Sequence, residues 1–179
     1  MRRTLVLGGA RSGKSGYAEK LLGAAPAVYV ATARQDPDDP EWAARILRHV
    51  ARRPRSWSTV EPAEPGALVE LLRAAVPGPP ILVDDLGNWL TGLLDATGGW
   101  DGEPVAARAE CGRLVDAIGA CRTDLVIVSP EVGLGVVPET ASGRVFRDEL
   151  GALNAAVADR CTDVVLLVAG IPLRLKPGR

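Results

Sequence analysis

Short apolar runs alternate along the chain with segments in which apolar residues recur at helical spacing. The runs are bounded by glycine and proline, which is typical of buried strands. We predict strands at residues 4–9, 27–33, 57–61, 79–86, 124–129, 164–170 and 172–176. The segments between them predict helices at 14–22, 36–53, 64–75, 105–121 and 143–160, and a further helix directly after the strand at 79–86. Apolar strands that alternate with helices indicate an α/β fold with a mostly parallel sheet flanked by helices.

Composition and charge narrow the class of protein. Hydrophobic residues make up 47% of the 179 residues and charged residues 24%, as in ordinary soluble proteins, and we expect residues 1–179 to form a single domain. The formal net charge of -1 gives no overall case for binding nucleic acid or a membrane surface. The longest apolar run, at 164–173, is too short to span a bilayer. The three cysteines lack metal-site spacing, so we expect reduced thiols in a cytoplasmic protein.

The segment GGARSGKS (8–15) fits the phosphate-binding pattern G-x-x-x-x-G-K-[ST] and lies between a predicted strand and a predicted helix. Its glycines let the backbone fold round a phosphate with N–H groups pointing inward. Lys14 can reach the β- and γ-phosphates, and the Ser15 hydroxyl can ligate Mg²⁺. We therefore predict a nucleoside triphosphate site formed by Gly8, Gly9, Ala10, Arg11, Ser12, Gly13, Lys14 and Ser15.

Two carboxylates end the apolar strand ILVDDL (81–86), where a P-loop enzyme needs an acid that faces Mg²⁺. Asp84 is the preferred candidate for this metal role and Asp85 the second. The alternative for either residue is the N-cap of the following helix, a position that aspartate favours. The sequence leaves the choice for Asp85 open.

The only histidine, His49, lies in a strongly basic segment, ARILRHVARRPR (44–55). On a helix, Arg45, Arg52 and Arg53 would share its face. Neighbouring positive charge disfavours the imidazolium form, so His49 should stay neutral and nucleophilic, and the arginines could hold a triphosphate under attack. The alternative is a solvated basic helix whose histidine has no chemical role, and composition alone favours that interpretation.

Several longer motifs occur in a fixed order: GGARSGKS, YVATA, AARILRHVARRP, LVDDL, SPEVGLGVVPE, GRVFRDELGALN and GIPLRLK. With them the chain resembles, over essentially its whole length, the bifunctional adenosylcobinamide kinase / adenosylcobinamide-phosphate guanylyltransferase family of cobalamin biosynthesis. The resemblance implies a RecA-like P-loop NTPase fold, a homotrimer and two reactions. In the first, ATP or GTP phosphorylates adenosylcobinamide. In the second, a histidine takes GMP from GTP and passes it to adenosylcobinamide phosphate, which gives adenosylcobinamide-GDP.

The resemblance also implies roles for single residues. His49 matches the histidine that becomes guanylylated, with Lys14 as the second catalytic residue. Glu61 matches a nucleotide-binding acid, although an ordinary carboxylate at a strand end would look the same. Ser15 and Asp84 are the expected Mg²⁺ ligands. The remaining implied nucleotide contacts are Thr32, Ala33, Arg34, Arg52, Arg53 and Asp84.

Two positions depart from the family pattern. Pro130 stands where the family often has asparagine, and Asp85 where it often has cysteine. Pro130 removes a backbone donor, which bears on substrate fit but not on the reaction type. Alternative functions are a P-loop kinase or transferase with one activity only, and a non-catalytic GTP-binding regulator. The regulator would need no nucleophilic histidine. The sequence does not rank ATP against GTP as the phosphate donor and does not identify the residues that contact the corrin ring.

Overall fold

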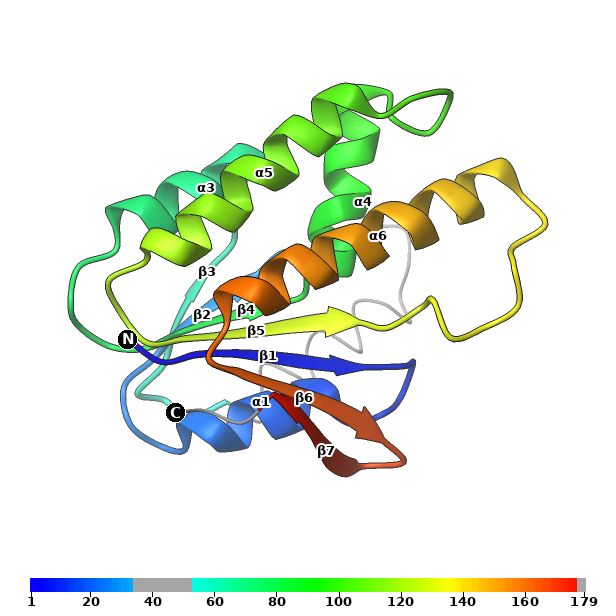
Figure 1. Cartoon of the computed structure of the whole chain (residues 1–179). Helices are drawn as coiled ribbons and strands as arrows, with labels where there is room; N and C mark the ends of the chain where they lie inside the picture. Colours follow the sequence, from blue (N-terminus) through cyan, green and yellow to red (C-terminus); the bar gives the residue numbers. More distant parts are fainter. Residues whose placement is uncertain (34–52, 177–179) are drawn as a thin grey trace.

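The computed structural model describes residues 1–33 and 53–176, which form a seven-stranded sheet with helices on both faces (Figure 1). The strand order is β3-β2-β4-β5-β1-β6-β7. The strands are β1 (Arg3–Gly8), β2 (Val28–Ala31), β3 (Ser58–Val60), β4 (Ile81–Asp84), β5 (Leu125–Pro130), β6 (Asp163–Val168) and β7 (Ile171–Lys176). All neighbours pair in parallel except β6 and β7, which are antiparallel. The α/β fold with a mostly parallel sheet is therefore as predicted.

Helices cover the two faces of the sheet unequally. Figure 1 shows α3, α4, α5 and α6 above the sheet and α1 below it. The helices are α1 (Lys14–Leu22), α3 (Pro65–Ala74), α4 (Leu86–Thr97), α5 (Val105–Ala120) and α6 (Ala141–Arg160). Among the described residues, none of these helices is both long and apolar enough to cross a membrane.

The alternation of side chains along the strands divides the core into two layers. In β4, Ile81 and Val83 face the layer beneath α3 to α6, whereas Leu82 faces the layer over α1. The central strands are apolar on both faces, as expected for a parallel sheet covered on both sides. The alternation also decides which polar side chains meet, because residues two apart on one strand share a face.

Most predicted elements that lie within the described residues match their observed bounds closely, but two differ. The helix predicted at 143–160 begins at Ala141, because the Thr140 hydroxyl accepts a hydrogen bond from the N–H of Gly143 at 3.1 Å and caps the helix. The strand predicted at 164–170 ends at Val168, because Ala169 and Gly170 have φ of 51° and 79° and form a tight turn into β7. The helix predicted at 36–53 lies, except for Arg53, outside the described residues.

The parallel strands place the predicted chemistry at one edge of the sheet. β1, β2 and β4 end at Gly8, Ala31 and Asp84. Ala31 is directly opposite Asp84 in the sheet, and β5 separates β4 from the P-loop strand β1. Ligands of open α/β sheets bind at this carboxyl edge. A site here has to join residues of α1 to residues of β4 across the intervening strand.

Candidate active site

The P-loop is a compact turn between β1 and α1. The N–H of Ser12 donates to the carbonyl of Gly9 at 3.3 Å, and Gly13 has φ of 88°, a left-handed conformation that favours glycine. The N–H of Gly170, in the β6–β7 turn, donates to the carbonyl of Ser12 at 3.2 Å. Lys14 then starts α1, with its ammonium 3.5 Å from the carbonyl of Gly9. The loop is therefore held by one hydrogen bond within it and one from the β6–β7 turn, and it leads into the N-terminus of α1, where backbone N–H groups can bind phosphate.

Ser15 and Asp84 are in contact although β5 lies between β4, which ends at Asp84, and β1, the strand that leads into α1. The Ser15 hydroxyl donates to Oδ1 of Asp84 at 3.1 Å. A hydroxyl and a carboxylate are hard oxygen donors, and Mg²⁺ typically combines one or two such protein ligands with phosphate oxygens and water. This pair therefore fits the Mg²⁺ ion of a bound nucleotide. Both residues are the Mg²⁺ ligands expected from the P-loop motif and the strand-end acid.

Asp85 adopts the alternative role that the sequence left open. Its side chain accepts a hydrogen bond from the N–H of Asn88 at 2.9 Å and caps the N-terminus of α4. Burial raises the pKa of Asp85, and the neighbouring charge of Asp84 raises it further. The carboxylate of Asp85 thus caps α4, and Asp84 is the acid that contacts Ser15.

Tyr29 joins this pair from β2, and the sequence analysis did not single it out. Its hydroxyl donates to Oδ2 of Asp84 at 2.7 Å, so each carboxylate oxygen of Asp84 accepts one hydroxyl hydrogen bond. Tyr29 is 3% exposed. Burial raises the pKa of Tyr29 strongly, and the charge of Asp84 raises it further, so the phenol stays protonated and acts as a donor. The available signal was a tyrosine in an otherwise aliphatic buried strand, since a buried hydroxyl needs a partner.

Arg53, predicted as a nucleotide contact, lies against the aromatic residues of this face. Its guanidinium carbon is 3.3 Å from the centre of the Tyr29 ring, and Nη1 donates to the Thr59 hydroxyl at 3.2 Å. Trp57 stacks on Tyr29 with 6.5 Å between ring centres. The Nε atom of Arg53 is buried and has no hydrogen-bond partner among the described residues. Arg53 is thus fixed beside Tyr29 by its ring contact and one hydrogen bond.

The structure describes some of the other predicted site residues at this edge of the sheet but not all of them. The hydroxyl of Thr32, which follows β2, donates to the carbonyl of Asp85 at 2.6 Å, and this bond ties the β2 end to the β4 end. Ala33 comes next, and Glu61, an exposed residue, directly follows β3. Three predicted site residues lie outside the described residues: Arg34, His49 and Arg52.

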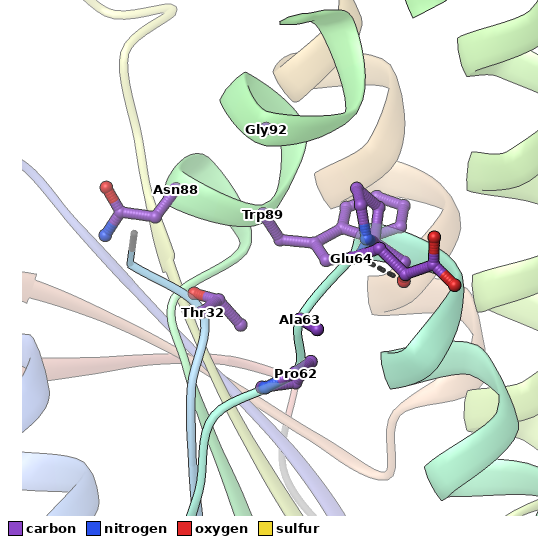
Figure 2. Close-up of a pocket in the computed structure, with 8 residues that line it drawn as sticks. Thr32, Pro62, Ala63, Glu64, Asn88, Trp89 and Gly92 are labelled. Carbon is purple, nitrogen blue, oxygen red and sulfur yellow. Dashed lines mark hydrogen bonds between the residues drawn. The ribbon is translucent and has the colours of Figure 1, made fainter. Parts of the chain in front are cut away.

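A small pocket opens beside Thr32, between the chain before α3 and the first turns of α4 (Figure 2). Trp89 forms one wall, with its indole N–H donating to the carbonyl of Pro65 at 3.0 Å. The volume is about 20 Å³, enough for about one water molecule. This pocket is therefore too small for a purine base. It is lined by Thr32, Pro62, Ala63, Glu64, Pro65, Asn88, Trp89 and Gly92.

Comparisons with known proteins give a consistent result. Residues 4–175 match the model of the family described as cobinamide kinase / cobinamide phosphate guanyltransferase. A bifunctional adenosylcobalamin biosynthesis protein, CobP, of Pseudomonas aeruginosa is 44% identical over 179 residues, covering 97% of this chain and 97% of that protein. Bifunctional adenosylcobalamin biosynthesis proteins named CobU are 40% identical in Escherichia coli and 41% identical in Salmonella typhimurium. Each alignment covers 96% of this chain and 98% of the relative.

A similar solved structure supports the fold of this chain but not its function. An ATPase described as prototypical of the type III secretion system of pathogenic bacteria superimposes with a TM-score of 0.60 at 12% identity. The match covers 93% of this chain and 51% of that ATPase chain. At this identity the likeness shows a shared arrangement of strands and helices, in agreement with the predicted P-loop NTPase fold.

Proposed function

The chain belongs to the cobinamide kinase / cobinamide phosphate guanyltransferase family, and on that premise we propose that it catalyses both reactions of its bifunctional relatives. The first would phosphorylate adenosylcobinamide at the expense of ATP or GTP. The second would transfer GMP from GTP to adenosylcobinamide phosphate. The protein is thus a transferase of cobalamin biosynthesis. Because its relatives are bifunctional, they favour this function over a kinase with one activity or a GTP-binding regulator.

The hydrogen bond between Ser15 and Asp84 is the observation that carries this proposal. It brings the P-loop hydroxyl within 3.1 Å of a strand-end carboxylate, as nucleotide-metal binding by a P-loop enzyme requires. Ser15 and Asp84 would hold Mg²⁺, which when bound offsets negative charge on the phosphates. Lys14 and the N–H groups of the P-loop would bind the phosphate oxygens themselves. Thr32, Ala33 and Glu61 would contact the nucleotide from the ends of β2 and β3.

In the kinase reaction, a hydroxyl oxygen of adenosylcobinamide attacks the γ-phosphorus of the nucleotide. The bond from that phosphorus to the β-phosphate oxygen breaks, the nucleoside diphosphate leaves, and the hydroxyl proton passes to solvent. The protein contributes mainly position and charge, because phosphoryl transfer needs little covalent chemistry from side chains. Lys14 is the residue that we assign to the charge developing on the transferred group.

In the guanylyl transfer, a ring nitrogen of His49 attacks the α-phosphorus of GTP, and pyrophosphate leaves. GMP is then held on the ring as a phosphoramidate. A phosphate oxygen of adenosylcobinamide phosphate attacks the same phosphorus, the N–P bond breaks, and His49 is regenerated. Arg34, Arg52 and Arg53 would hold the triphosphate during the attack, which is the functional interpretation of the basic segment.

Separate assays of the two reactions test this proposal. The wild type should phosphorylate adenosylcobinamide and should guanylylate adenosylcobinamide phosphate. His49→Ala should keep the first activity and lose the second, because only the second needs the nucleophile. Arg55→Ala, in the same basic segment but without an assigned role, is the matched control and should keep both. A His49→Ala protein that still transfers GMP would rule out His49 as the nucleophile.

We also propose that the enzyme works in the cytoplasm as a homotrimer. The cysteines support the first point, since Cys111, Cys121 and Cys161 are all free thiols, as expected in a reducing compartment. Exposed apolar side chains support the second. Val168, Ile171, Leu173 and Leu175 are all more than half exposed at the β6–β7 edge of the sheet, and apolar surface of this kind is typical of an interface.

A further inference from the structure

Tyr29 links the carboxylate of Asp84 to the guanidinium of Arg53, and no step of the two reactions described above uses it. Its hydroxyl reaches Oδ2 of Asp84 at 2.7 Å, and the face of its ring lies 3.3 Å from the guanidinium carbon of Arg53. Trp57 stacks on the same ring, with the planes of the two rings 29° apart. The ring is therefore held by its neighbours and does not depend on Asp84 for its position.

The sheet register explains why this contact forms. Tyr29 is directly opposite Leu82 in the parallel pair of β2 and β4, so Asp84 lies two residues further along on the same face. The long side chain of tyrosine spans this diagonal, and its hydroxyl lies 2.7 Å from Oδ2 of Asp84. The alignment of two central strands thus brings the phenol to the acid, and no loop is involved.

The two oxygens of Asp84 are used in different ways. Oδ1 accepts from Ser15, the residue that would hold Mg²⁺, and Oδ2 accepts from Tyr29. We propose that Tyr29 is a positioning residue that holds the Asp84 carboxylate in the orientation needed for the Mg²⁺ ion of the bound nucleotide. This inference rests on the metal role of Ser15 and Asp84 proposed above. Without the phenol, the carboxylate could rotate away from Ser15, and the oxygen pair would bind the ion less well.

A purely structural role for Tyr29 would have a different signature. A buried hydroxyl that only satisfies its own hydrogen bond would affect the stability of the fold and leave the response to Mg²⁺ unchanged. A positioning residue changes how strongly Mg²⁺ improves nucleotide affinity. Tyr29→Phe separates these roles, because phenylalanine keeps the ring under Arg53 and against Trp57 and removes only the hydroxyl.

The experiment measures GTP affinity by calorimetry, in EDTA and then in saturating MgCl₂. All proteins carry His49→Ala so that the proposed GMP acceptor is absent and GTP is not consumed. The chain has one other tyrosine, Tyr17 in α1, whose hydroxyl has no hydrogen bond among the described residues, so Tyr17→Phe is the matched control. Affinity in EDTA and the thermal unfolding midpoint report whether each variant is folded.

Tyr29→Phe should bind GTP in EDTA as the parent does and lose about tenfold of the affinity gain from MgCl₂, as expected for a hydrogen bond to a charged group. Tyr17→Phe should keep the full gain. A full gain in Tyr29→Phe, with or without a lower unfolding midpoint, would overturn the inference while leaving the proposed metal role intact. If the parent itself gained nothing from MgCl₂, the metal role would fail and this inference with it.

Discussion

Two adjacent carboxylates have different tasks because one reaches across the sheet and the other turns back onto its own helix. Asp84 accepts from Ser15 of α1 and Tyr29 of β2, whereas Asp85 accepts from the N–H of Asn88. The Asp84 carboxylate accepts hydrogen bonds from two hydroxyls and would also bind the proposed Mg²⁺ ion. The Asp85 carboxylate caps the N-terminus of α4, a position that stabilises an anion but that a neutral asparagine side chain fills equally well.

Replacing Asp85 tests this division. Asp85→Ala should lower the free energy of unfolding by about 1 kcal/mol, because the Asn88 N–H loses its cap. Asp85→Asn should unfold at close to the wild-type denaturant concentration, since asparagine caps as well as aspartate. Both variants should keep the gain in GTP affinity from MgCl₂. Loss of that gain in Asp85→Asn would show that Asp85 also serves the metal.

The cysteines give a prediction of pH dependence. Burial raises the pKa of both Cys111 and Cys161 from 9.0 to about 12. At pH 8 these thiols should react with a thiol reagent far more slowly in the native protein than after unfolding in denaturant. Unfolded thiols ionise near pH 9, whereas the folded thiols stay protonated up to about pH 12. The contribution of Cys111 and Cys161 to the free energy of unfolding is therefore complete below about pH 9 and is lost as the pH rises towards 12. Equally fast labelling in both states would contradict the burial.

At the scale of elements, α4 and β5 approach so closely that one position tolerates only glycine. A Cβ atom on Gly87 would lie 2.6 Å from Cγ of Pro130 and 3.1 Å from its Cδ. The proline ring is rigid and ends β5, so the contact can be relieved only by moving α4. Because α4 starts at the Asp85 cap beside Asp84, its position also bears on the site.

Gly87→Ala should therefore lower the free energy of unfolding by about 1–3 kcal/mol, the usual cost of overpacking, although alanine is the better helix former. Gly112→Ala in α5 is the matched control, because a Cβ atom there meets nothing within 4 Å. It should raise stability by about 0.5–1 kcal/mol. Chemical denaturation of the two variants compares them directly, and equal stabilities would contradict the close approach.

The sequence predicted elements better than it predicted contacts between them. The central strands were visible because β1, β4 and β5 are short apolar runs buried on both faces. Two local motifs singled out Ser15 and Asp84, which are hydrogen-bonded in the structure. The Tyr29–Asp84 bond was not predicted, because its partners are 55 residues apart and meet only through the register of β2 and β4. The role of Asp85 was left open for a related reason, since cap and metal ligand favour the same residue type.

For the whole molecule, the apolar strip at the β6–β7 edge of the sheet is where the proposed homotrimer would form its interface. Leu173 is 54% exposed and lies in β7, the last strand of the sheet. Light scattering of the wild type should give about three times the chain mass of 18.8 kDa. Leu173→Glu should reduce that mass, because a carboxylate buried in an interface is costly. Val76→Glu, at an exposed apolar residue after α3, is the control and should stay trimeric. A monomeric wild type would rule out the trimer.

In the proposed enzyme one P-loop site supports two chemistries, phosphoryl transfer from the γ-position and nucleophilic attack at the α-phosphorus. In this proposal the P-loop, Ser15 and Asp84 serve both reactions, and His49 is assigned to the second alone. A covalent GMP–protein species formed without any acceptor would be specific to that second chemistry.

The most direct measurement incubates the protein with GTP labelled at the α-phosphate, without corrinoid, and then denatures it. The wild type should retain label that is stable in alkali and lost in acid, as a phosphoramidate is, and His49→Ala should bind GTP but retain none. Label in the wild type alone would establish the GMP–histidine intermediate. No label on a wild type that binds GTP would contradict the guanylyltransferase half of the account.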